Sequence, residues 1–202
     1  MTDRAWVLLK SGQRLDLLEP DPYAWTDEDL ATGLARTYRW GGHSKWELPL
    51  SVAQHSLTVL RIRELHAGRV LTAAERLREL AHDMDEGLLG FDAITPLKPH
   101  LGEGYHCVVG QLRHAIEIRY DLQPWDQDSY AAHKWADRLA AASEAYHVVG
   151  WSAADIRFSL GITIEPMATD PVPLPPGMQA WEPWPPRLAA GMFLGLLQDL
   201  QR

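Results

Sequence analysis

The sequence predicts an all-α fold, a helical bundle that follows a small hairpin. Helix-capping patterns open the segments that begin at Thr26, Ser51 and Thr72. Apolar residues at helical spacing follow the second and third of these caps. The chain has 202 residues, of which 46% are hydrophobic. This size suits a single domain with one substantial core.

The N-terminal part predicts a hairpin and then the first helix. Residues 6–9 and 14–18 lie on either side of Ser11-Gly12, which is a turn signal. The segment Pro20-Asp-Pro22 then separates the hairpin from a helix that we expect from about Thr26. Thr26 can cap this helix, and acidic residues fill its first turn, where they favour the helix dipole.

The helix expected from Ser51 carries the first histidine of interest. Ser51 and Gln54 form a capping-box pattern. The apolar stripe of this helix consists of Val52, Val59 and Ile62. His55 lies inside that stripe, so we expect its ring to point into the protein interior.

A second capping box, Thr72 to Glu75, opens a helix that we expect to continue as far as Leu88. Its predicted buried face consists of Leu77, Leu80, Ala81, Met84 and Leu88. The pair His82-Asp83 borders this face.

A further helix is expected from about Ser129, after an amphipathic stretch from Val108 to Arg119. On it, Asp137 shares a side with the small residues Ala140 and Ala141 and with Glu144. Burial of a carboxylate without a partner is costly, so a cation beside Asp137 is the expected compensation.

The order His55, His82-Asp83, Asp137 predicts a metal site. Two imidazoles and two carboxylates suit one divalent transition metal: zinc, manganese, cobalt or iron. One inward histidine or one His-Asp pair is more often structural. Three helices that each bring a ligand-type side chain to an apolar face instead favour a metal-dependent hydrolase.

Five short motifs, in order, resemble those of the HD-domain phosphohydrolase superfamily, in its branch of deoxynucleoside 5′-nucleotidases and phage-type deoxynucleoside triphosphate triphosphohydrolases. They are Arg39-Trp-Gly-Gly-His43, Leu50-Ser-Val-Ala-Gln-His-Ser56, Ala81-His-Asp-Met-Asp-Glu86, Thr95-Pro-Leu-Lys98 and Trp135-Ala-Asp-Arg-Leu139, followed by Glu144. The likeness extends from about Gly12 to Val149 and implies an HD-domain helical bundle.

The resemblance implies roles for named residues. The implied metal ligands are His55, His82, Asp83 and Asp137. The implied catalytic carboxylates are Glu86, as acid or base, and Asp92, in a loop one residue longer than the family pattern. We expect Asp85 to be a solvated helix residue.

Substrate binding is expected from the same motifs. Arg39 and Lys98 should bind phosphate, because hydrolysis of a phosphate ester needs positive charge beside its oxygens. Trp40 is either a contact to sugar or base that disfavours a 2′-hydroxyl, or a core aromatic. His43 should contact phosphate or brace the site, and Lys45 should reach a longer polyphosphate tail.

These features predict metal-dependent hydrolysis of deoxynucleotides, and they favour a triphosphohydrolase that releases deoxynucleoside and triphosphate. A 5′-nucleotidase acting on monophosphates is one open alternative. A non-catalytic, nucleotide-binding HD module is another, although the intact Glu86 argues against it. Mg²⁺ bound with the nucleotide is a second expected cofactor.

Composition limits the expected partners and location. The formal net charge of −8 disfavours binding of polymeric nucleic acid. The single cysteine, Cys107, excludes an internal disulfide framework and is compatible with a reducing cytoplasm. Without an apolar run of about 20 residues or a secretion signal, the expectation is a cytoplasmic protein with no membrane partner.

The C-terminal part has its own composition. Eight of the 14 prolines lie between Pro166 and Pro186, which predicts an extended arm, anchored by Trp181 and Trp184. Residues 187–200 are apolar on most sides, so this helix should dock on its own core or on a sister subunit of a homo-oligomer. The expected organisation is therefore an HD phosphohydrolase domain over residues 1–165, with residues 166–202 packed on it.

Overall fold

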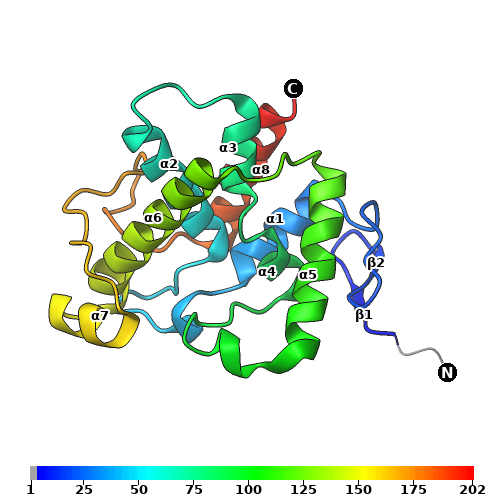
Figure 1. The fold of residues 1–202 in the computed structure, drawn as a ribbon, viewed down its shortest axis with the longest axis horizontal. Coiled ribbons are helices and arrows are strands. Elements are labelled where there is room, and N and C mark those ends of the chain that lie inside the picture. The colour runs from blue at the N-terminus through cyan, green and yellow to red at the C-terminus, as the bar shows by residue number, and fades with distance from the viewer. Residues whose placement is uncertain (1–3) are drawn as a thin grey trace.

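A computed structural model describes residues 4–202 as eight α-helices and one two-stranded antiparallel sheet (Figure 1). The all-α prediction is confirmed, and so is the hairpin. Its strands β1 (Trp6–Leu8) and β2 (Arg14–Asp16) pair with Val7 opposite Leu15. Gly12 closes the turn in a left-handed conformation, with a φ of 88°.

The first two long helices begin where the caps predict. α1 (Asp27–Arg36) is capped by Thr26, and α2 (Val52–His66) by Ser51, whose side chain accepts from the Gln54 amide. The prediction of a full capping box is wrong, because the Gln54 side chain does not bond back to the Ser51 amide. The Gln54 side chain instead donates to the Glu182 carbonyl at 3.0 Å and accepts from the Trp184 amide at 2.8 Å.

The helix predicted from Thr72 to Leu88 is two helices, α3 (Ala73–Leu80) and α4 (Met84–Leu89). The break has a local cause. Nδ1 of His82 donates to the Glu79 carbonyl at 2.8 Å, and that carbonyl would accept from the Asp83 amide in a continuous helix. His82 and Asp83 therefore lie in the turn between α3 and α4.

The next three helices follow in order. α5 (Gly102–Arg119) begins earlier than expected, α6 (Gln127–Glu144) ends in a π-helical turn, Ala145–Val149, and α7 (Ala153–Leu160) follows. α6 packs along α2, as Figure 1 shows. This packing brings residues more than 80 positions apart to the same place, as the His55–Glu144 contact demonstrates.

The C-terminal residues cover the bundle on one side. No helix or strand occurs between Leu160 and Pro186, and both Trp181 and Trp184 are buried there. α8 (Pro186–Leu200) packs on α1 and buries Phe193 and Leu197 in the main core. Within residues 4–202 no helix combines the length and apolarity that crossing a membrane requires.

Candidate active site

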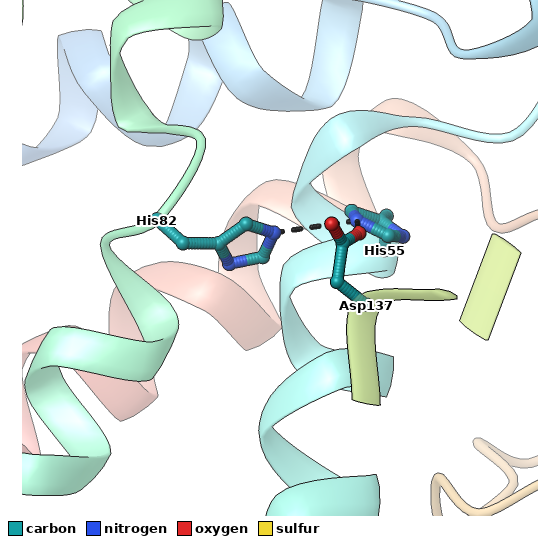
Figure 2. A group of neighbouring side chains, drawn as sticks. All are labelled: His55, His82 and Asp137. Atoms are coloured by element: carbon teal, nitrogen blue, oxygen red, sulfur yellow. Dashed lines mark hydrogen bonds and ion pairs between the residues drawn. The ribbon is translucent and has the colours of Figure 1, made fainter. Parts of the chain in front are cut away.

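Side chains from three places in the fold meet at one point. His55 comes from α2, His82 from the α3–α4 turn and Asp137 from α6. One potential ligand atom from each lies within 4.8 Å of the others. Figure 2 shows the two rings pointing toward each other with the Asp137 carboxylate beside them.

Asp83 lies next to this group. Its Oδ2 atom is 3.2 Å from Nε2 of His82 and 3.6 Å from Nε2 of His55. Oδ1 of Asp137 is 3.4 Å from Nε2 of His55. The structure thus brings together all four side chains that the sequence predicts as ligands.

Each imidazole is held by a hydrogen bond at its other nitrogen. Nδ1 of His55 donates to Oε1 of Glu144 at 2.6 Å, and Nδ1 of His82 donates to the Glu79 carbonyl at 2.8 Å. A carbonyl can only accept, so the proton of neutral His82 lies on Nδ1, and the carboxylate of Glu144 favours the same tautomer for His55.

This donor set fits a transition-metal ion. Two neutral rings in these tautomers direct their Nε2 lone pairs at the same space, with the nitrogens 3.3 Å apart. Such an arrangement is unfavourable without positive charge between the rings. Two ligands at about 2.0–2.1 Å from a tetrahedral ion are roughly 3.3–3.4 Å apart. A ligating histidine whose second nitrogen donates to a carboxylate or carbonyl is also the usual pattern at metal sites.

The electrostatics of the site favour a cation. Burial and the Arg39 charge oppose protonation of His55, yet Glu144 and Asp137 outweigh them and raise the pKa of His55 to about 9. Burial likewise opposes ionisation of Asp83, but His82 and His55 lower its pKa. The carboxylates therefore keep positive charge on His55 at neutral pH, and a metal ion would replace that charge.

Glu144 joins the metal candidates to the phosphate-binding candidates. Its Oε2 atom accepts from Nε of Arg39 at 2.9 Å and from Nε1 of Trp40 at 3.3 Å. Trp40 adopts a φ of 58°, which is rare for a residue with a side chain. The shared acceptor holds Arg39 and Trp40 beside the ligand group and helps to maintain the strained backbone of Trp40.

Glu86 is 2% exposed and does not itself line the cavity described below. Its Oε1 atom accepts from Nζ of Lys98 at 3.1 Å, and its buried Oε2 atom has no partner within residues 4–202. Burial, followed by the charges of Asp83 and Asp92, raises the pKa of Glu86 well above its ordinary value. Such a carboxyl can keep a proton at a pH where an exposed one cannot.

A cavity of about 700 Å³ opens in front of these side chains. Asp83, His82 and Asp137 line it, as do Arg39, Trp40, Asp92 and Lys98. The Asp92 carboxylate is 3.9 Å from Arg39, so the longer loop still delivers it to the cavity wall. The volume falls within the range of small-molecule sites, roughly 300–1,000 Å³.

Three expected residues lie elsewhere. Asp85 is not solvated: it is 2% exposed and pairs with Arg113 at 3.1 Å, because α5 covers this side of α4. His43 is exposed, and neither it nor Lys45 lines the cavity. Gly41 and Gly42, both at positive φ, turn the chain away from the site after Trp40.

Sequence reasoning missed His133 and Glu79. His133 is buried on α6, lines the cavity and donates from Nδ1 to Oε2 of Glu79 at 2.8 Å. Burial lowers the pKa of His133, which favours the neutral ring. The position of His133, one helical turn before Asp137, was a usable signal, whereas Glu79 resembles any charged residue on an amphipathic helix.

Comparisons with known proteins identify a relative without an assigned activity. An uncharacterized protein of Rhodobacter capsulatus is 40% identical over 155 residues, which amount to 75% of this chain and 77% of the relative. No protein-family model matches the chain.

Proposed function

The chain belongs to the same family as this Rhodobacter capsulatus protein, and from its site we propose that it is a metal-dependent phosphohydrolase of deoxynucleotides, specifically a deoxynucleoside triphosphate triphosphohydrolase. The observation that carries the proposal is the convergence of two imidazoles and two carboxylates at a cavity that Arg39 and Lys98 also line. The ordered motifs that resemble HD-domain phosphohydrolases support the same reaction.

His55, His82, Asp83 and Asp137 would hold the metal. A bound transition metal supplies a Lewis acid that activates water and polarises a phosphoryl oxygen. The protein's own part begins with Glu144 and the Glu79 carbonyl, which orient the two rings. These hydrogen bonds fix the direction in which the two Nε2 atoms point.

The remaining side chains would neutralise the charge of the phosphate and transfer protons. Arg39 and Lys98 neutralise phosphate oxygens, and the planar guanidinium of Arg39 suits two oxygens at once. Glu86, which pairs with the cavity residue Lys98, would hold or give up the proton of the leaving oxygen, because burial keeps Glu86 protonated to a higher pH than usual. Trp40 borders the cavity, where its ring can pack against the sugar.

Product analysis tests the proposal. Purified protein loaded with Mn²⁺, Co²⁺, Zn²⁺ or Fe²⁺ is incubated with deoxy and ribo mono- and triphosphates, and the products are separated by chromatography. We expect deoxynucleoside and inorganic triphosphate from the deoxynucleoside triphosphates. Inorganic phosphate from monophosphates alone would indicate a 5′-nucleotidase, and no turnover with metal bound would indicate a binding module.

A further inference from the structure

His133 is a cavity residue whose ring is fixed on two sides. It lies on α6 one turn before Asp137, and it is 4% exposed. Nδ1 donates to Glu79 at 2.8 Å, and Trp125 stacks on the ring with centroids 4.7 Å apart and an interplanar angle of 25°. The ring can therefore neither flip nor tilt without losing a contact.

The Glu79 carboxylate determines which ring nitrogen carries the hydrogen. It is 1% exposed, and its Oε1 atom accepts from Nε of Arg63 at 2.6 Å. Because a carboxylate accepts, the hydrogen of neutral His133 lies on Nδ1, and Nε2 presents a lone pair. Among residues 4–202, Nε2 of His133 has no hydrogen-bond partner. A nearly buried acceptor in a cavity wall suits a donor on a bound molecule.

The position of His133 limits which donor that is. Its ring centroid lies 4.9 Å from that of His82, a proposed metal ligand, so it would lie near the part of a bound nucleotide that adjoins the reacting phosphate. Ionised phosphate oxygens carry no hydrogen to donate. A 2′-deoxynucleotide esterified at O5′ has one sugar hydroxyl, on C3′, and the donors of the base lie farther from the phosphate.

We propose that Nε2 of His133 accepts a hydrogen bond from the 3′-hydroxyl of the deoxynucleotide, which makes His133 a specificity-determining residue. The inference rests on the proposed function and names the sugar contact of the same site. Glu79 acts through His133, as a positioning residue that keeps Nε2 an acceptor.

Two variants separate this role from simple packing. His133→Asn retains a donor toward Glu79 and removes the Nε2 acceptor. Glu79→Gln can still accept from Arg63 through its amide oxygen, while its amide nitrogen donates to Nδ1 and forces the ring hydrogen onto Nε2. His114→Asn makes the same side-chain change at an exposed position of α5 and serves as the control.

The measurement is binding by calorimetry. Each variant is combined with Glu86→Gln to suppress turnover, loaded with Mn²⁺, and titrated with the four deoxynucleoside and four dideoxynucleoside triphosphates, or with the monophosphates if only these bind. Without a change at His133 we expect the 3′-hydroxyl to improve affinity roughly 10- to 100-fold. In His133→Asn and Glu79→Gln the ratio of deoxynucleotide to dideoxynucleotide affinity should fall toward one, with unchanged metal content. His114→Asn should leave this ratio as it is without a change at His133.

Equal affinity for deoxy and dideoxy forms with His133 in place would overturn the inference and leave the proposed function standing. A uniform loss for both forms, or a change that follows the base instead of the 3′-hydroxyl, would also overturn it. Failure of the metal-loaded protein to bind any nucleotide would instead refute the proposed function, and the inference with it.

Discussion

The Nε2 atoms of His55 and His82 face each other at 3.3 Å because Glu144 and the Glu79 carbonyl engage the opposite nitrogens. This residue-scale arrangement could be predicted only in part. The order of histidines and aspartates in the sequence predicts the ligands themselves. The Glu79 carbonyl could not be predicted as the partner of His82, because every residue has a backbone carbonyl. Its role as an acceptor depends on where the chain bends.

Removal of a ligand should release the metal. We expect His55→Ala and Asp83→Ala to lower metal affinity by more than about 100-fold, because loss of even an outer hydrogen-bond partner commonly costs about 10- to 100-fold. Elemental analysis of the folded variants after dialysis checks this, with the exposed His114→Ala as control. Full occupancy in both ligand variants would place the metal elsewhere.

Glu86→Gln should have opposite effects on activity and stability. Turnover should fall by roughly two to four orders of magnitude, as for loss of general acid–base help. Wild-type Glu86, with its raised pKa, keeps a proton in the folded protein above pH 4.5, where the unfolded chain loses it. The contribution of Glu86 to the stability of the metal-free wild type therefore decreases as pH rises from about 4.5 through the raised pKa of Glu86, and Glu86→Gln removes that loss.

Urea denaturation of the metal-free wild type and Glu86→Gln at pH 5.5 and pH 8 measures the effect on stability. The advantage of the variant in unfolding free energy should be larger at pH 8. The same or a smaller advantage at pH 8 would show that Glu86 ionises normally in the folded protein.

Lys98 should contribute to phosphate affinity through its charge. Lys98→Ala should weaken binding of a poorly hydrolysed deoxynucleoside triphosphate analogue by about tenfold at low salt, and by less at high salt, where ions screen the attraction. Lys45→Ala is the matched control, because Lys45 does not line the cavity. If both variants bind as the wild type does at both salt concentrations, Lys98 lies outside the phosphate site.

Among the elements, α1 and α4 approach so closely that only glycines fit where they cross. A Cβ atom at Gly87 would lie 2.5 Å from Cγ of Leu34, and one at Gly33 would lie 2.2 Å from the Gly87 carbonyl oxygen. Because the chain turns between α3 and α4, α4 can take its own direction and pack closely on α1. The sequence predicts one helix here because the apolar spacing that follows the capping box continues through His82. The hydrogen bond from the His82 ring to the Glu79 carbonyl depends on the orientation of the ring, which the apolar spacing does not encode.

Gly87→Ala should destabilise the protein by roughly 1–3 kcal/mol, since the added methyl group forces α1 and α4 apart. The control is Gly110→Ala on α5, where a Cβ atom would meet nothing within 4 Å. This control should be neutral or stabilising by up to about 1 kcal/mol, because alanine favours a helix. Chemical denaturation measures both, and equal stabilities would show that the helices can separate without cost.

Across the whole molecule, the C-terminal arm and α8 complete the fold around the site-bearing helices. Proline content predicts the extended arm, and its two tryptophans are buried as expected. Its attachment could not be predicted, because Gln54 reaches Glu182 and Trp184 about 130 residues away in sequence, and no local pattern encodes that pairing. Gln54 directly precedes His55, so the hydrogen bonds between the arm and Gln54 also stabilise the first turn of α2 beside the site.

If His55 holds a catalytic metal ion, hydrolysis of nucleotides must depend on that ion. Release of deoxynucleoside from deoxynucleoside triphosphates is measured for the purified protein as loaded, after chelation, and after return of the metal, alongside His55→Ala. We predict turnover that disappears with the metal, returns with it, and remains absent in His55→Ala. Turnover that survives complete chelation, or a fully metal-loaded wild type that hydrolyses none of the deoxynucleotides, would contradict the account.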